Sequence, residues 1–300
     1  MTTQSGILLI DKPEGPSSAQ VVHQVKKSLG AKKVGHLGTL DPFASGLLLI
    51  GVNEGTKIAD IFLGGIKSYS AVMTLGVETD TQDRTGTVVA EQAVPRIGTP
   101  ELRALEKKFT GALQQVPPMF SALKKDGVRL YRLARQGKEV PREPRNIRID
   151  ALKLKKLNDC EIEFDVTCSR GTYVRTLAAD MGKELGCGAH LKTLRRTACD
   201  HLAVDQAIDL ETLKARAATH RLPFLSLSAA LAQLRAVSWQ SPLVARLRLG
   251  QQAVLGQIGK RLGDEEFVRI LDARGGLAAL AKWNDDIPGG HWRLSRVFHE

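Results

Sequence analysis

A strictly alternating stretch between residues 161 and 168 is the feature that most restricts the fold of this chain. Its apolar residues occupy every second position, and they are Ile162, Phe164, Val166 and Cys168. Successive side chains of a strand point to opposite faces, so this alternation predicts a half-buried strand. The chain therefore has to build a sheet.

The rest of the first 234 residues predicts strands interleaved with helices. Apolar runs and turn residues place the elements as follows: strands at 7–10, 47–52 and 67–76, a loop at 34–46, and helices at 17–29, 99–109 and 175–185. The first helix has clear end signals, because Ser17 is a suitable N-cap and Gly30 stands where a helix stop is expected.

The sequence changes in character after about Leu234. Short strand-like pieces follow, separated by Gly and Pro turns: around Val254, at 267–271, at 277–283 and at 292–297. This pattern is typical of a small β-rich domain. With 300 residues, the chain is long enough for one large domain and one small one. We therefore expect a large domain over residues 1–234 and a small domain over residues 235–300.

Basic residues exceed acidic ones by 43 to 32, which gives a formal charge of +11. The surplus is concentrated between Lys124 and Lys156, where twelve basic residues and four acidic ones stand. Phosphate contacts need basic groups on a shared surface, so this clustering favours a nucleic-acid partner. The surrounding region from Pro117 to Pro144 is rich in Pro, Gly and basic residues, which predicts a projecting insertion.

Cysteine usage and the N-terminus indicate a reduced, cytoplasmic protein. The four cysteines form no C-x-x-C pair and show no zinc-ligand spacing with His, so no metal site is expected. The apolar run before Asp11 has no basic segment ahead of it and no cleavage pattern after it, which excludes a signal peptide. No apolar stretch approaches the roughly 18–20 residues of a membrane span, so we expect a soluble protein with no membrane contact.

The segment from Gly35 to Leu48 is a predicted loop and strand entrance that presents one His, one Asp and three Gly. Pro42 restricts Asp41 to extended geometry, which would point its carboxylate away from the turn. An Asp in such a place often caps a turn with its own side chain, and the local chemistry alone favours that role. The nearby Gly51–Lys57 segment fails as a phosphate loop because its Thr precedes its Lys.

The same segment closely resembles the catalytic motif of the TruB family of pseudouridine synthases, G-H-x-G-x-L-D-P-x-A-x-G-x-L. Other blocks resemble that family in the same order along the chain: Asp11–Ser18, Lys67–Tyr69, Thr79–Asp83, Gln115–Lys124, Ala134–Gly137, Cys168–Leu177 and Gly186–Arg196. The resemblance covers about residues 5–210. Leu37, Phe43 and Ser17 depart mildly from the family pattern, which concerns the shape of the pocket more than its chemistry.

The resemblance implies an α+β fold: a central mixed, largely antiparallel sheet flanked by helices, with an RNA-gripping insertion over about residues 117–150. We also expect a PUA-like RNA-binding domain at residues 235–300. This expectation is based only on its position after the catalytic domain and on its pattern of short predicted strands. The implied reaction converts uridine 55 in the T-loop of tRNA to pseudouridine. It needs no cofactor, because the product is an isomer of the substrate.

Three catalytic residues follow from the matching blocks. Asp41 corresponds to the family nucleophile, although the sequence leaves open whether it attacks the sugar or the uracil ring. Arg175 would pair with Asp41 and favour its charged form. Tyr69 would stack on the flipped uracil, and its hydroxyl is a candidate for assisting proton removal at the ring carbon. Asp80 is expected to be structural or to contact RNA.

The other implied site residues bind RNA. His36 is expected to stack in the splayed-out loop rather than act as a base, and Tyr173 and Leu194 are expected to line the pocket. Candidates for phosphate contacts are Lys12, Lys57, Lys124, Arg129, Arg132 and Arg135. The expected partner is tRNA, bound by a monomer with no obligatory protein partner. Two alternatives stay open: a guide-RNA-directed relative, and a catalytically silent RNA-binding protein on the same scaffold.

Overall fold

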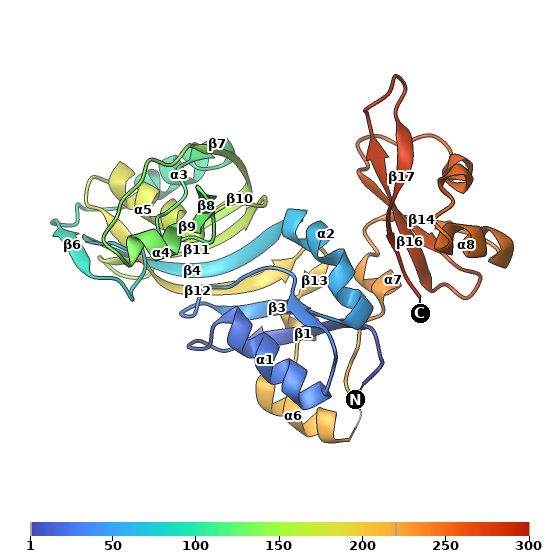
Figure 1. Ribbon diagram of the computed structural model, residues 1–300. Helices are drawn as coiled ribbons and strands as arrows, with labels where there is room; N and C mark the ends of the chain where they lie inside the picture. The colour runs from blue at the N-terminus through green and yellow to red at the C-terminus, as the bar shows by residue number, and fades with distance from the viewer. Residues whose placement is uncertain (1, 220, 300) are drawn as a thin grey trace.

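A computed structural model of the chain describes residues 2–219 and 221–299, and its largest feature is one mixed sheet (Figure 1). Within these residues the sheet has nine strands: β1 (Gly6–Lys12), β2 (Val34–His36), β3 (Ser45–Val52), β4 (Lys67–Leu75), β7 (Gly111–Gln115), β10 (Arg145–Lys156), β11 (Glu161–Cys168), β12 (Ala189–Cys199) and β13 (Leu202–Ala203). The main path runs β1-β3-β12-β4-β11-β10-β7. Only β3 and β12 pair in parallel among these strands. The predicted mixed, largely antiparallel sheet is confirmed.

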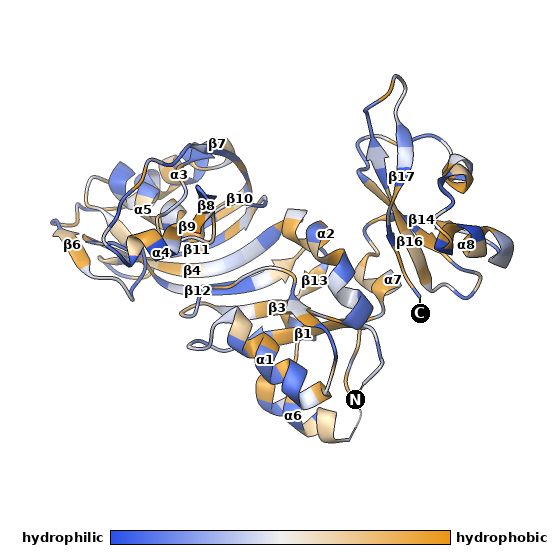
Figure 2. Cartoon of the chain, in the orientation of Figure 1, coloured by the Kyte–Doolittle hydropathy of each residue, from blue (hydrophilic) through white to orange (hydrophobic). Residues whose placement is uncertain are grey.

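The described helices have the following bounds: α1 (Ser18–Leu29), α2 (Ala59–Gly64), α3 (Thr99–Lys108), α4 (Leu130–Ala134), α5 (Val174–Glu184), α6 (Leu210–Ala218), α7 (Leu227–Ala230) and α8 (Ser241–Arg248). Helices α1, α3, α5 and α6 pack on the main sheet, whereas α8 packs against residues 277–284 near the C-terminus. The ends of α1 form as predicted. The Ser17 side chain accepts a hydrogen bond from the Gln20 amide, and Gly30 closes the helix in the left-handed conformation. The apolar stripe of α1 stands out against its polar face in Figure 2.

The two faces of the sheet belong to two different apolar clusters. Along β1, Leu8 and Ile10 join the cluster built with α1, α3, α5 and α6, whereas Ile7 and Leu9 join a second cluster on the opposite face. This split follows from the two-residue period of a strand. Because both faces are covered, β1 is apolar at nearly every position and shows no alternation.

A second, four-stranded sheet forms the C-terminal part of the chain and stands beside α7 in Figure 1. Its strands are β14 (Arg235–Ser238), β15 (Phe267–Leu271), β16 (Leu277–Asn284) and β17 (His291–Val297). Three of them were expected from the sequence. That this part is a separate, PUA-like domain stays a prediction. Leu277, Leu280 and Phe298 belong to the second cluster of the main sheet, which also holds Phe62 of α2 and Leu227 of α7, so the C-terminal sheet joins the main sheet through this shared cluster.

The expected strand around Val254 is wrong. Residues 252–258 form a 3-10 helix, η3 (Gln252–Ile258), in which Val254, Leu255 and Ile258 are buried. Their spacing brings them to one side of a helical turn, and a short apolar run does not distinguish a strand from a buried helix. Two further 3-10 segments are η1 (Asn53–Ile58) and η2 (Val204–Gln206).

The basic insertion contains little regular structure. It holds the two-residue strands β8 (Lys124–Lys125) and β9 (Val128–Arg129), followed by α4. Residues 145–150, which the sequence assigned to the insertion, form the first half of β10 and pair with β7, because Ile147 and Ile149 are buried in the main core. A separate hairpin, β5 (Val77–Thr79) with β6 (Val88–Glu91), carries the Thr79–Asp83 turn. Among the described residues, no helix combines the length and apolar character needed to cross a bilayer.

Candidate active site

The loop between β2 and β3 holds Asp41 at its tip and is fixed from the start of α1. The Ser18 hydroxyl lies 2.9 Å from both the amide nitrogen and the carbonyl oxygen of Leu40. The Gly15 amide donates to the Pro42 carbonyl at 2.8 Å. Both chain neighbours of Asp41 are therefore held by residues of the Asp11–Ser18 block, which explains why the two blocks occur together.

Asp41 and Arg175 form the ion pair that the sequence predicts across 134 positions. Arg175 Nε donates to Asp41 Oδ2 at 2.9 Å. The Arg175 side chain is only 5% exposed, whereas that of Asp41 is 39% exposed. A buried guanidinium thus orients a carboxylate that remains open to solvent and to a ligand. This geometry suits a nucleophile whose carboxylate is held in one orientation.

Arg175 also joins two other segments. Its Nη1 donates to the Thr81 carbonyl at 2.6 Å, and its Nη2 donates to the Phe120 carbonyl at 2.8 Å. The guanidinium therefore connects the Asp41 loop, the acidic turn and the base of the insertion. No sequence signal marked the Phe120 and Thr81 carbonyls, because any residue supplies a backbone carbonyl.

Asp83 is a second carboxylate at this centre that the sequence did not single out. It is buried, and its Oδ2 lies 3.7 Å from Arg175 Nε. Its Oδ1 accepts hydrogen bonds from the Thr81 hydroxyl and from the Thr85 amide, both at 2.9 Å. Asp80 instead accepts from the Thr87 amide at 2.8 Å, which is a turn-stabilising role. The spacing Thr-x-Asp was the available signal for Asp83.

Tyr69 lies on β4, partly buried against the main core and next to Leu194 in that cluster. Burial raises the pKa of the Tyr69 hydroxyl to about 12, although the Arg196 guanidinium nearby lowers it in part. The phenol therefore keeps its proton at neutral pH and acts as a hydrogen-bond donor and acceptor. Tyr173 borders the same centre, and burial raises its pKa, with Asp41 among the smaller contributions.

His36 lies on β2, paired with Ile50 of β3. Burial lowers its pKa, and the positive charge of Arg196 lowers it further. Its Nδ1 is buried without a hydrogen-bond partner in the described part of the chain. A neutral imidazole without a carboxylate partner fits the predicted stacking role better than acid–base work.

Comparison with known proteins agrees with this arrangement. The family model described as TruB family pseudouridylate synthase (N terminal domain) matches residues 26–174, and tRNA pseudouridylate synthase B C-terminal domain matches residues 175–235. The tRNA pseudouridine synthase B of Geobacter sulfurreducens is 42% identical over 309 residues, covering 98% of this chain and 99% of that protein. The chain belongs to the TruB family. The family resemblance predicted from the motifs is confirmed.

Other relatives carry the same name. The tRNA pseudouridine synthase B of Syntrophotalea carbinolica is 39% identical over 304 residues, covering 99% of this chain and 98% of that protein. That of Geotalea uraniireducens is 52% identical over 206 residues, covering 69% and 66% of the two chains. A chain in the crystal structure of a Cbf5–Nop10–Gar1 complex superimposes with a TM-score of 0.73 at 25% identity, covering 98% of this chain and 85% of that one.

The structure corrects the expected phosphate contact of Lys12. Its side chain is fully buried, and its ammonium donates to the carbonyls of Pro13, Pro16 and Pro42 at 2.9, 2.8 and 3.2 Å. The three carbonyls accept the N–H groups of the Lys12 ammonium, so none of these donors is left for a phosphate. In this TruB family protein Lys12 supports the Asp41 loop from below.

Lys57 is also engaged inside the protein. Its ammonium lies 2.5 Å from Glu54 and donates to the Val297 carbonyl at 3.0 Å. It therefore ties η1 to the end of β17, where Arg296 also pairs with Asp60 at 3.1 Å. The Lys57 side chain is still 31% exposed, so its phosphate contact stays a prediction.

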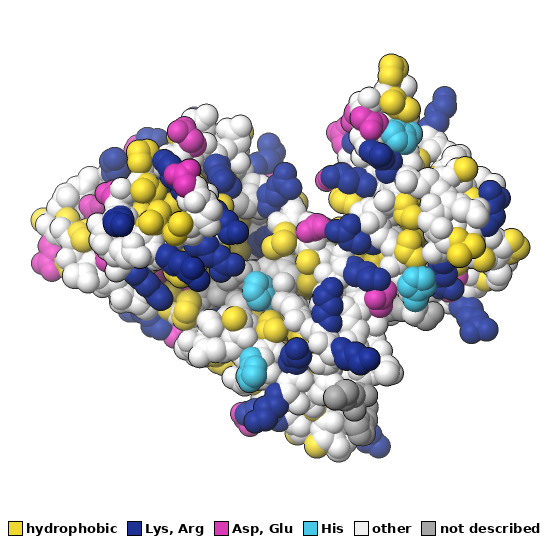
Figure 3. Space-filling model, viewed as in Figure 1, with side chains coloured by type: hydrophobic (Ala, Val, Ile, Leu, Met, Phe, Trp, Pro, Cys, Tyr) yellow, Lys and Arg dark blue, Asp and Glu magenta, His cyan; other side chains and the backbone are white. Residues whose placement is uncertain are grey.

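The four basic candidates of the insertion are all exposed: Lys124, Arg129, Arg132 and Arg135. Lys124 and Arg129 face each other across the β8–β9 pair. Figure 3 shows Lys and Arg side chains gathered on both sides of the hollow between the insertion and the C-terminal sheet. These cations are accessible to an RNA backbone, whereas the fully buried Lys12 is not.

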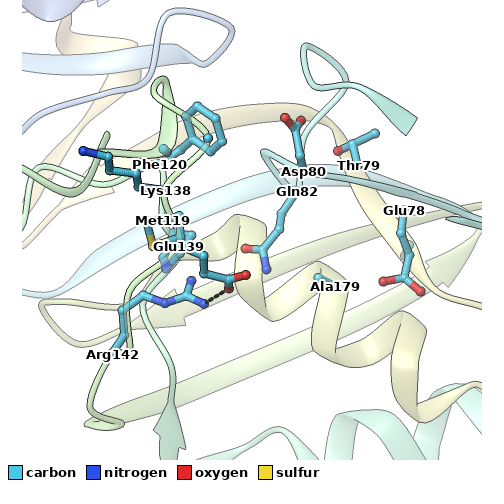
Figure 4. A pocket seen from close by; sticks show the side chains of 14 residues that line it. Glu78, Thr79, Asp80, Gln82, Met119, Phe120, Lys138, Glu139, Arg142 and Ala179 are labelled. Atoms are coloured by element: carbon cyan, nitrogen blue, oxygen red, sulfur yellow. Dashed lines mark hydrogen bonds and ion pairs between the residues drawn. The ribbon is translucent and has the colours of Figure 1, made fainter. Parts of the chain in front are cut away.

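A cavity of about 420 Å³ lies next to the Asp41–Arg175 pair, between the insertion and the β5 turn (Figure 4). Asp80, Gln82, Phe120, Glu139 and Arg142 line part of it. Neither Asp41 nor Arg175 lines this cavity, so it borders the catalytic centre without containing it. Over the described residues no cluster of three or more His, Cys, Asp or Glu side chains is arranged to hold a metal ion.

Proposed function

We propose that this protein converts uridine 55 in the T-loop of tRNA to pseudouridine, with Asp41 as the nucleophile. The observation that carries the proposal is the open Asp41 carboxylate held at 2.9 Å by the buried Arg175. Relatives named tRNA pseudouridine synthase B match nearly the whole chain, which supports tRNA as the substrate. We further propose that the protein works as a monomer in the cytoplasm, where its free cysteines stay reduced.

The reaction is an isomerisation that this chain's residues can support without an added reagent. The bond between the ribose C1′ and uracil N1 breaks, the base turns, and a bond from C1′ to uracil C5 forms. The proton on C5 leaves and N1 gains one, so atoms and charge balance. Attack on the sugar and attack on the ring both need a carboxylate as nucleophile, and Arg175 Nε orients that of Asp41 at 2.9 Å.

The target base has to leave its stack before Asp41 can reach it. Tyr69 would contact the flipped uracil, and its protonated hydroxyl could donate a hydrogen bond or relay a proton near the ring. His36 would occupy the space that the flipped nucleotide leaves. The exposed cations of the insertion would grip the phosphates of the T-arm.

The test is to incubate the purified protein with an unmodified T-arm stem-loop and to map pseudouridine chemically. We expect product at the T-loop uridine with protein alone. The likeness to a chain of the Cbf5–Nop10–Gar1 complex makes a guide-directed enzyme the alternative. Product that forms only after a guide RNA and partner proteins are added would establish that alternative. RNA binding without product under either condition would overturn the assignment of an enzyme.

Removing three cations of the insertion should weaken T-arm binding and flatten its salt dependence. Each lost phosphate contact reduces the slope of log K against log salt by about 0.7–0.9. The triple change Lys124→Gln, Arg129→Gln and Arg132→Gln is therefore expected to lower the slope by about two, measured by filter binding at several salt concentrations.

A matched control removes three exposed cations outside the insertion and outside the Lys124–Lys156 cluster, at Arg96, Arg103 and Lys107. This control should leave the slope within about 0.5 of the wild-type value, because single surface charges away from bound RNA release no condensed ions. Equal slopes for both triple variants would show that the insertion is not the phosphate-gripping surface.

Activity should fall as the pH rises through about 8. Burial lowers the pKa of Lys12 from 10.5 to about 8, although the neighbouring Asp41 raises it in part. Below that pH the charged ammonium holds the Pro42 carbonyl beside Asp41, and above it the charge is lost. The measurement is kcat/KM on the T-arm between pH 6 and 10. Lys12→Arg keeps its charge over this range, so an unchanged alkaline limb in that variant would contradict the assignment.

A further inference from the structure

Arg196 is a buried cation that has no role in the reaction proposed above. It lies on β12 and is 3% exposed. Its Nε donates to the Leu47 carbonyl at 2.7 Å, its Nη2 to the Gly38 carbonyl at 3.1 Å, and its Nη1 to the Thr39 carbonyl at 3.4 Å. In the described parts of the chain no carboxylate lies within ion-pair distance of it.

These three carbonyls belong to the two ends of the loop that carries Asp41. Gly38 and Thr39 precede Asp41, and Leu47 is the third residue of β3, which follows the loop. The planar guanidinium of Arg196 therefore connects the two ends of the loop through hydrogen bonds. The backbones also touch here, because a Cβ on Gly46 would lie 2.3 Å from the Arg196 carbonyl oxygen. Arg196 thus fixes the base of the Asp41 loop, whereas Ser18, Gly15 and Lys12 hold the residues next to Asp41.

The other side of Arg196 faces Tyr69. The two residues are direct partners in the antiparallel β12–β4 pair, so their side chains project from the same face of the sheet. The Arg196 charge lowers the pKa of Tyr69 against the larger effect of burial, and it also lowers the pKa of His36. One guanidinium therefore neighbours the Asp41 loop, Tyr69 and His36.

Stability alone does not explain such a residue. Burying a guanidinium with carbonyl partners only is costly, and an apolar side chain of similar volume often replaces a buried charge without loss of stability. The planar fork of arginine, in contrast, fixes several acceptors at once in a way that lysine does not. The arrangement is the one expected of a group that orients a reacting residue.

We propose that Arg196 is a positioning residue, which holds the Asp41 loop in its reactive orientation and keeps that loop in register with Tyr69. This inference rests on the proposed function, because it assumes that Asp41 reacts. Arg196 itself need not touch the RNA. Its loss should therefore lower kcat and leave RNA binding nearly unchanged.

Lys67 provides a matched control on the neighbouring strand. It is also a buried cation, and its ammonium donates to three carbonyls, those of Phe62, Leu63 and Gly65 at 2.8, 3.1 and 2.6 Å. These carbonyls lie at the end of α2 and not in the Asp41 loop. Lys67→Met should therefore lower the melting temperature without lowering kcat of the folded protein.

The experiment compares Arg196→Lys, Arg196→Gln and Lys67→Met in single-turnover and steady-state assays on the T-arm, at a temperature where each is folded. We expect kcat to fall about tenfold or more in both Arg196 variants, with KM and Kd within about twofold of wild type. Arg196→Lys should retain more activity than Arg196→Gln, because it keeps the charge beside Tyr69. Lys67→Met should stay within about threefold in kcat.

Three outcomes would overturn the inference. They are wild-type kcat in both Arg196 variants, an equal loss of kcat in Lys67→Met, and failure of both Arg196 variants to fold while Lys67→Met folds. The last would make Arg196 a folding residue. Activity in Asp41→Asn would instead refute the proposed function, so the two failures are distinguishable.

Discussion

Replacing Asp41 by asparagine should abolish pseudouridine formation, by at least about a thousandfold, without unfolding the protein. The amide keeps the shape of the side chain, and its oxygen can still accept the hydrogen bond that Arg175 Nε donates at 2.9 Å. It cannot form and release a covalent bond to the nucleotide. The measurements are single-turnover product formation, T-arm binding and thermal unfolding.

The affinity of Asp41→Asn for the T-arm distinguishes a nucleophilic role of Asp41 from a role in folding or in RNA binding. Removal of a negative charge near RNA should leave affinity equal or slightly higher. Glu14→Gln is the control for charge loss, since Glu14 lies on the surface one residue from the Gly15 amide that holds Pro42. It should keep activity within about threefold. Product from Asp41→Asn at a few per cent of the wild-type rate would refute the nucleophile, and loss of binding would point to a structural role.

Substituting alanine for Gly46 should destabilise the protein more than other glycine changes in the main sheet. Gly46 has φ +98°, and a Cβ there would lie 2.3 Å from the Arg196 carbonyl oxygen and 2.8 Å from its amide nitrogen. Both contacts are backbone atoms of the parallel β3–β12 pair, so neither can move aside alone. We expect the free energy of unfolding to fall by about 2–3 kcal/mol beyond the cost of the positive φ.

Gly111→Ala is the control that separates the cost of the close contact at Gly46 from the cost of its positive φ. Gly111 has a nearly equal φ of +104°, but a Cβ there would meet no atom within 4 Å. It should therefore show the backbone cost of about 1–3 kcal/mol alone. Urea unfolding followed by circular dichroism compares the two variants. Equal losses of unfolding free energy in the two variants would show that the close approach of β3 and β12 is unimportant. Gly46→Ala should in addition lose activity, because it displaces the Asp41 loop.

Much of the local structure was predictable because short-range signals decide it. The capping of α1 depends on Ser17 and Gln20, three residues apart, and the β11 strand shows its period within eight residues. The error at Val254 has the same origin, since a run too short for a period leaves strand and helix equivalent. The strand β14 carried no distinctive pattern, because it lies at a sheet edge.

The sequence by itself determined the family, the α+β class and the identity of Asp41, Tyr69 and Arg175 as candidates, because each stands in a motif with its own spacing. Only the tertiary structure decided which cations face solvent. Lys12 looks like a surface lysine in the sequence, yet it is fully buried and one of its carbonyl partners, Pro42, lies 30 positions away. The importance of Asp83 and Arg196 likewise depends on contacts between segments that lie far apart in the chain. Backbone carbonyls are the same at every residue, so no sequence pattern records which of them a buried side chain will bind.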